Sequence, residues 1–199
     1  MENWLAISPW PGLSLWILLY ISDYYLTIYS ARGFREIGHF QFEGSFELTP
    51  QFQKDIEALK PVSRLHIIML ILHSLLIILI WWLTQIFFSF RWAYLFCLGM
   101  YLLIEVAVHL RHLRNVFLIN EARKNGGVEG QISYRQHFSY RISALDFYSY
   151  SGLFLIIAIL TYSPFFFGGS LMCFATGFKH SLLARKTKAN SLQATESQA

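Results

Sequence analysis

The hydrophobic residues of this chain are gathered into five apolar stretches. They cover residues 13–30, 65–90, 92–110, 142–161 and 165–184. Each stretch is about long enough to cross a hydrocarbon layer of ~30 Å as a helix, which takes about 20 residues. The pattern therefore predicts an all-α membrane protein, built as a bundle of five transmembrane helices.

The last two stretches are separated only by Tyr162, Ser163 and Pro164. Proline disfavours helix in the residue before it and tolerates the start of a helix. We therefore expect a tight turn between the two spans, and a re-entrant loop in place of the fifth span stays open. Residues 1–188 are expected to form a single transmembrane bundle, and the polar residues 189–199 a disordered cytoplasmic tail.

The basic residues predict how the bundle is oriented. Cytoplasmic loops of membrane proteins collect Lys and Arg, whereas external loops do not. With five spans, all 16 Lys and Arg residues except Arg91 fall between spans one and two, between spans three and four, or near the end of span five. This distribution predicts an external N-terminus and a cytoplasmic C-terminus, in the cytoplasmic membrane if the source is bacterial.

Composition supports a lipid environment. The chain is 55% hydrophobic and 14% charged, whereas a soluble domain carries about 25% charged residues. The net charge of +4 is accounted for by the orientation signals, so we expect no nucleic-acid partner. The expected partners are the lipid bilayer and either a second copy of the chain or another subunit of a membrane complex. Cys97 and Cys173 fall inside apolar stretches, which excludes a disulfide framework.

The segment between the first two spans has a pattern of its own. Apolar and polar residues alternate over residues 40–48 around Glu43-Gly44, which predicts a short hairpin in the cytoplasm. Thr49 can cap a following helix that has Pro50 at its first position. The apolar face of that helix, within residues 52–59, is expected to lie on the membrane surface.

Four ionisable residues in the predicted spans are candidates for an ion or proton site. Asp23, His73, Glu105 and Asp146 all fall in the cytoplasmic half of their spans. Unpaired charges in a membrane helix cost several kcal/mol, so such residues usually face a polar interior. We expect the four to share one cavity open to the cytoplasm. The alternative is mutual hydrogen bonding that only fixes the packing of the helices.

A second pattern indicates a metal. Glu105, His109 and His112 share one face of a helix, and His66 and His73 share a face of the preceding span. Imidazoles and carboxylates that are open to water suit a divalent metal such as zinc, iron or manganese. Histidines near basic helix ends are also common as interfacial residues, and that interpretation stays open.

The spacing of these histidines resembles that of the histidine-box membrane hydroxylases and desaturases. Those enzymes use more histidines than the seven of this chain, and His39 and His137 lie outside the predicted spans. A complete di-iron box is therefore not expected.

Small residues mark one face of the fifth span. Gly169, Cys173 and Gly177 are four residues apart and so lie on the same side of a helix. Small side chains let two helices approach closely in a membrane. The face predicts a helix interface, either within the chain or between copies of it.

Three functions are compatible with these patterns. The leading hypothesis is ion- or proton-linked transport, or a channel, because buried ionisable groups commonly mark ion pathways. The alternatives are a metal-dependent membrane enzyme that acts on a lipidic substrate, and a non-catalytic subunit or scaffold of a membrane complex. The sequence names neither the solute nor the metal, and it leaves open whether the chain is an enzyme.

Overall fold

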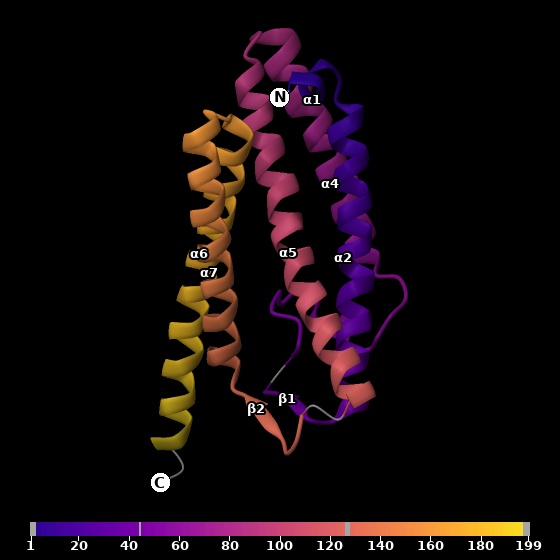
Figure 1. Cartoon of the computed structure of the whole chain (residues 1–199), viewed down its shortest axis with the longest axis vertical. Helices are drawn as coiled ribbons and strands as arrows, with labels where there is room; N and C mark the ends of the chain where they lie inside the picture. Colours follow the sequence, from indigo (N-terminus) through magenta and orange to yellow (C-terminus); the bar gives the residue numbers. More distant parts are fainter. Residues whose placement is uncertain (1–2, 44, 126–127, 197–199) are drawn as a thin grey trace.

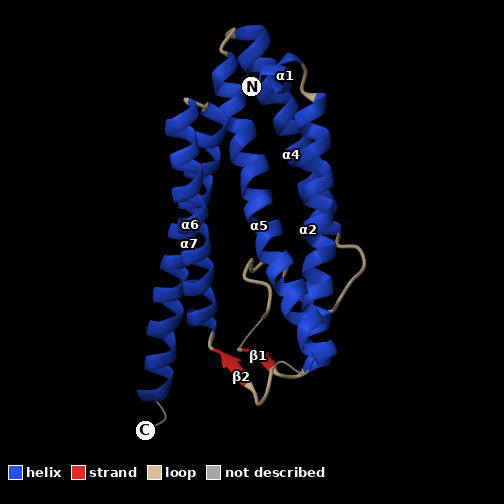
Figure 2. Ribbon diagram, viewed as in Figure 1, coloured by secondary structure: helices blue, strands red, loops and turns tan. Residues whose placement is uncertain are grey.

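A computed structural model describes residues 3–43, 45–125 and 128–196 of the chain. Helices dominate it, and the described elements follow in the order α1 (Asn3–Ile7), α2 (Trp10–Ile37), β1 (Phe40–Phe42), α3 (Gln53–Glu57), α4 (Arg64–Trp81), the π-helix η1 (Trp82–Phe87), α5 (Arg91–Asn125), β2 (Ile132–Tyr134), α6 (Gln136–Thr161) and α7 (Pro164–Glu196) (Figure 2). The predicted all-α class is confirmed.

The long helix α5 runs between the other long helices. In Figure 1, α2 and α4 lie on one side of it, and the antiparallel pair of α6 and α7 lies on the other. The N-terminus and α1 lie at one end of the bundle, which we call the N-terminal end. The strands β1 and β2 lie at the opposite end, the β end, between α2 and the pair of α6 and α7.

Three helical segments are long and apolar enough to cross a membrane. Among the described residues they are Arg64–Phe87, Arg91–Lys124 and Gln136–Thr161, which contain most of the second, third and fourth predicted stretches. The first and fifth stretches also form single helices, α2 with 28 residues and α7 with 33. The apolar helices are compatible with an integral membrane protein, and the number of spans remains a prediction.

The helix ends follow local chemistry. The Ser63 hydroxyl accepts a hydrogen bond from the backbone N–H of His66 at 3.2 Å and caps α4. Gly38, with φ of 72°, ends α2 in a left-handed conformation that suits glycine. Tyr162 ends α6 in the same region, and Pro164 then begins α7. The tight turn predicted between these two helices is confirmed.

The hairpin predicted over residues 40–48 is not confirmed. Its turn residue Gly44 lies outside the described residues, and β1 pairs in parallel with β2 instead of with the residues that follow it. Phe40 is paired with Ile132, and Phe42 with Tyr134. The alternating rings of residues 40–46 pack against Phe34 at the end of α2. The alternation thus reflects a strand, but its partner comes from the loop between α5 and α6.

The predicted surface helix is present as the short α3, but it begins at Gln53 after the N-cap residue Phe52, so the predicted cap by Thr49 is wrong. Its Ile56 is 2% exposed and packs with Tyr24 and Ile28 of α2, together with Phe52 and Leu59. The expected apolar face is therefore correct, but it packs against α2. At the other end of the chain, α7 continues to Glu196, past residue 189, from which the sequence predicts a disordered tail.

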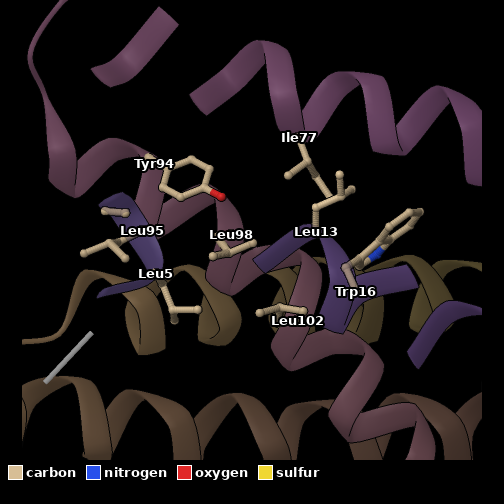
Figure 3. Close-up of a cluster of buried hydrophobic side chains, with 9 residues drawn as sticks. Leu5, Leu13, Trp16, Ile77, Tyr94, Leu95, Leu98 and Leu102 are labelled. Carbon is tan, nitrogen blue, oxygen red and sulfur yellow. The ribbon is translucent and has the colours of Figure 1, made fainter. Parts of the chain in front are cut away.

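The largest core cluster lies toward the N-terminal end. Figure 3 shows Leu13 and Trp16 of α2 beside Leu98 and Leu102 of α5, with Ile77 of α4 above them. Lipid tails are as apolar as these side chains, so the contacts stabilise the bundle mainly through close packing. This cluster holds α2, α4 and α5 together away from the β end.

Glycines join α7 to α5. A Cβ atom on Gly99 would lie 1.9 Å from the backbone oxygen of Phe165, and one on Gly168 would lie 1.9 Å from that of Phe96. The two backbones therefore touch at this crossing, which no larger residue permits.

The small-residue face predicted on the fifth span is packed within the chain. Gly169 lies against Leu103 of α5, and Gly177 lies against Tyr148 of α6. Cys173 is fully buried.

Candidate functional site: a polar cavity at the β end

A cavity of about 500 Å³ lies among α2, α5, α6 and α7 at the β end. The strands and residues 46–49 form part of its lining. Its aromatic lining consists of Phe34, Phe40, Phe42, Phe46, Tyr134 and Phe147. Its ionisable lining, apart from Tyr134, consists of Asp23, Glu47, Arg111, His112, Arg114, Lys179 and His180.

A hydrogen-bonded acid–imidazole pair joins α2 to α5 at this cavity. Nε2 of His112 lies 2.8 Å from Oδ1 of Asp23 and 3.1 Å from the hydroxyl of Thr27. Asp23 and Thr27 are four residues apart, so both point from one face of α2 toward the ring. Nδ1 of His112 is buried without a hydrogen-bond partner. The pair thus leaves one ring nitrogen without a partner in the described part of the chain.

One helical turn away, a second histidine joins the same two helices. Nδ1 of His109 lies 2.7 Å from the backbone oxygen of Glu105, which can only accept a hydrogen bond. Nδ1 therefore donates, and Nε2 lies 2.7 Å from the Ser22 hydroxyl, which in turn donates to the backbone oxygen of Leu19 at 3.0 Å. Both ring nitrogens are occupied within the chain.

Glu105 lies one helical turn from His109 on α5 and does not line the cavity. Its Oε2 atom is buried without a hydrogen-bond partner. The carboxyl group is close enough to Asp23 for the two to interact electrostatically.

Asp146 sits outside the cavity, where it holds two arginines of α5. Both of its oxygens accept hydrogen bonds from Arg114, at 3.2 and 3.1 Å. Nε of Arg111 lies 3.3 Å from Asp146 Oδ2, although that nitrogen makes no hydrogen bond. The Arg111 guanidinium also lies 5.0 Å from the ring centroid of Phe147. Asp146 thus fixes the cationic wall of the cavity.

The two histidines of α4 are enclosed by aromatic rings. His66 stacks on Tyr20, with ring centroids 4.1 Å apart, and lies 4.5 Å from the ring of Tyr24. Nδ1 of His73 donates to the backbone oxygen of Met69 at 2.7 Å, beside the rings of Trp16 and Tyr101. Neither histidine lines the cavity.

The predicted residues are therefore only partly brought together. Asp23 and His112 meet directly, Glu105 is near Asp23, and His73 and Asp146 lie elsewhere. Within residues 3–43, 45–125 and 128–196, no three His, Cys, Asp or Glu side chains are grouped so that they could hold a metal ion. The ligand set of Glu105, His109, His112, His66 and His73 is not gathered at one point.

Glu47 is a cavity residue that sequence patterns do not single out. Its Oε1 atom accepts a hydrogen bond from the backbone N–H of Thr49 at 2.7 Å. Burial raises the pKa of the Glu47 carboxyl above its ordinary value, and the Thr49 hydrogen bonds oppose this shift only in part. In the sequence, Glu47 looks like a polar residue in an alternating segment.

His180 is a second such residue. Its Nδ1 lies 2.8 Å from the Ser143 hydroxyl, and its ring is held between those of Tyr140 and Phe147. The only sequence feature that indicates a role for His180 is its position in the cytoplasmic half of the fifth stretch. In the sequence, Arg111 and Arg114 belong to the orientation signals, and that pattern does not predict their place in the cavity wall.

No family model, curated protein or solved structure matches this chain.

Proposed function

We propose that this chain is an integral membrane protein that couples the movement of a small solute to protons. The cavity at the β end opens to the cytoplasm and loads the solute. The observation that carries the proposal is the Asp23–His112 hydrogen bond in the cavity wall, on two helices of the bundle. Hydrogen-bonded Asp and His side chains inside membrane helices commonly form proton relays.

The proposed topology has five spans, an external N-terminus and a cytoplasmic C-terminus. The three apolar segments support this topology. The long helices α2 and α7 also support it, because they lie beside these segments (Figure 1). Lys and Arg near the β end fit a cytoplasmic face, whereas Arg91 begins α5 at the other end.

The two ends of the bundle differ in polarity, which favours a carrier over an open pore. The hollow of about 390 Å³ at the N-terminal end is lined mainly by apolar side chains, among them Trp92, Phe96 and Phe167. A solute bound at the β end has no polar exit there. Release on the other side would require helices around the cavity to move relative to one another, as in alternating access.

Proton flux into proteoliposomes tests the proposal. The purified chain is reconstituted with a trapped pH-sensitive dye, and a pH gradient is imposed while valinomycin and potassium hold the voltage at zero. The flux is measured with and without the dialysable small molecules of a cell extract. We expect the pH gradient to dissipate faster than in protein-free liposomes, either with or without the small molecules.

Matched variants locate the site. Asp23→Asn and His112→Gln should return the flux to the protein-free rate, because each removes one member of the pair. His137→Gln, outside the cavity lining, should retain the wild-type rate. Wild-type flux no faster than that of empty liposomes, or unchanged flux in both cavity variants, contradicts the proposed function.

A further inference from the structure

Arg111 lines the cavity, and one of its donors, beside Asp146, is unsatisfied. Its Nε atom is buried and makes no hydrogen bond, although Asp146 balances its charge at 3.3 Å. A buried N–H group without a hydrogen bond costs about 1–3 kcal/mol. Guanidinium groups bind carboxylate and sulfonate or phosphate oxygens through paired N–H groups. The residue is therefore suited to an anionic group that enters the cavity.

The charges around the cavity are balanced only when every acid is ionised. Three cations line it, namely Arg111, Arg114 and Lys179. The carboxylates that oppose them are Asp23 and Glu47 in the lining and Asp146 behind Arg111 and Arg114. A proton on Glu47 leaves one positive charge without a counter-charge, which an anion would supply.

The remaining walls are suited to an apolar group. Rings of Phe34, Phe42 and Phe46 approach from α2 and the segment after it, and Tyr134 stacks on Phe42 with centroids 5.3 Å apart. Phe147 lies on the other side, under the Arg111 guanidinium. A volume of about 500 Å³ falls in the range of about 300–1,000 Å³ that is usual for sites of small organic ligands.

We propose that the cavity binds a small organic anion that carries a flat apolar group, and that protonation of Glu47 strengthens this binding. Arg111 holds the anionic group, and the aromatic walls hold the apolar part. The inference rests on the proposed function, for which it names the class of solute.

Several ionisable groups surround Glu47 and set how it responds to pH. Asp23 of α2 and Arg111 of α5 act on it electrostatically, and Tyr140 of α6 faces it. The other ionisable groups that line the same cavity are Lys179 and His180 of α7, His112 and Arg114 of α5, and Tyr134 of β2. Arg111 is the group shared by Glu47 and the incoming anion. Neutral Glu47 therefore releases Arg111 to the anion, whereas ionised Glu47 competes with it.

Calorimetric titration of the purified, detergent-solubilised chain with sodium benzenesulfonate tests this inference. A sulfonate stays ionised at all working pH values, so a pH dependence of its binding belongs to the protein. We expect binding at least tenfold tighter at pH 5.5 than at pH 8. Sulfate, which lacks the ring, and benzyltrimethylammonium, which has the opposite charge, should bind at least tenfold more weakly than benzenesulfonate at pH 5.5. Equal binding of benzyltrimethylammonium, no sulfonate binding, or pH-independent affinity in the wild type overturns the inference.

Three variants separate charge from folding. Arg111→Gln should weaken sulfonate binding at least tenfold, whereas Arg123→Gln, whose side chain pairs with Glu36 outside the cavity lining, should not change it. Glu47→Gln should bind at pH 8 as tightly as the wild type does at pH 5.5, a gain that misfolding cannot produce. A Glu47→Gln variant that keeps the wild-type pH dependence overturns the role of Glu47. Proton flux that persists without sulfonate binding leaves the proposed function standing and removes only this solute class.

Discussion

At the scale of single residues, spacing along a helix predicts a shared face but not a shared partner. His109 and His112 are one turn apart on α5, yet they bind different residues of α2, Ser22 and Asp23. Glu105, His109 and His112 share a helix face, but the two histidines belong to separate hydrogen-bonded contacts with α2. Which residue of α2 lies opposite depends on the register of two helices, which a one-helix pattern does not contain.

Glu47 gives a prediction about stability and pH. The pKa of the Glu47 carboxyl is higher in the folded chain than in the unfolded chain. Protonated Glu47 therefore stabilises the fold fully at a pH below its pKa in the unfolded chain. This stabilisation is lost as the pH rises through its pKa in the folded chain. Glu47→Gln keeps an acceptor for Thr49 and removes the charge. We expect it to raise the unfolding midpoint at pH 8 by about 2–4 °C, as ~1 kcal/mol does in a chain of this size, and to change little at pH 4.

Thermal unfolding in detergent at the two pH values measures this effect. Glu57→Gln, at an exposed position of α3, is the matched control and should leave both midpoints unchanged. An equal change in both variants, or a lower midpoint for Glu47→Gln at pH 8, would contradict the buried-carboxyl explanation.

At the scale of elements, hydropathy predicts helices well and non-local pairing poorly. The five predicted stretches all lie mainly in helices, because an apolar run must satisfy its backbone within itself when it crosses lipid. The parallel pairing of β1 with β2 joins residues 40–42 to residues 132–134. No local signal links such distant segments, so the cavity wall that they form was not predictable, and neither was the position of Glu47 in it.

The crossing of α5 and α7 supports a second stability prediction. Gly99→Ala places a methyl group against the backbone of Phe165, which a side-chain rotation cannot relieve, and should lower the unfolding midpoint by several degrees. Gly152→Ala is the matched control, because a Cβ atom there meets nothing within 4 Å. That change should be neutral or stabilise α6 by about 0.5–1 kcal/mol. Similar midpoints for the two variants would mean that the close crossing is absent.

At the scale of the whole molecule, the polarity of the two ends gives the proposed function its direction. The cavity, the acid–imidazole pair and the strands are at the β end, whereas the opposite end has the apolar cluster and the apolar hollow. Solute loading from the cytoplasm requires that the β end face the cytoplasm. If it faced outward, the same cavity would load its solute from outside, so orientation is part of the mechanism.

Cysteine labelling in intact cells decides this orientation. Ile7 and Tyr162 are 71% and 92% exposed near the N-terminal end. Glu129 is exposed in the loop that follows α5 at the β end, and Ala189 is exposed late in α7. Each is replaced by cysteine in turn and treated with a membrane-impermeant maleimide.

We expect Ile7→Cys and Tyr162→Cys to react in intact cells, and Glu129→Cys and Ala189→Cys only after lysis, because an even number of crossings separates the members of each pair. The wild-type chain, whose Cys97 and Cys173 lie within the bundle, supplies the background. Labelling of Ala189→Cys in intact cells would show that α7 does not cross, and the reversed pattern at all four positions would place the cavity outside.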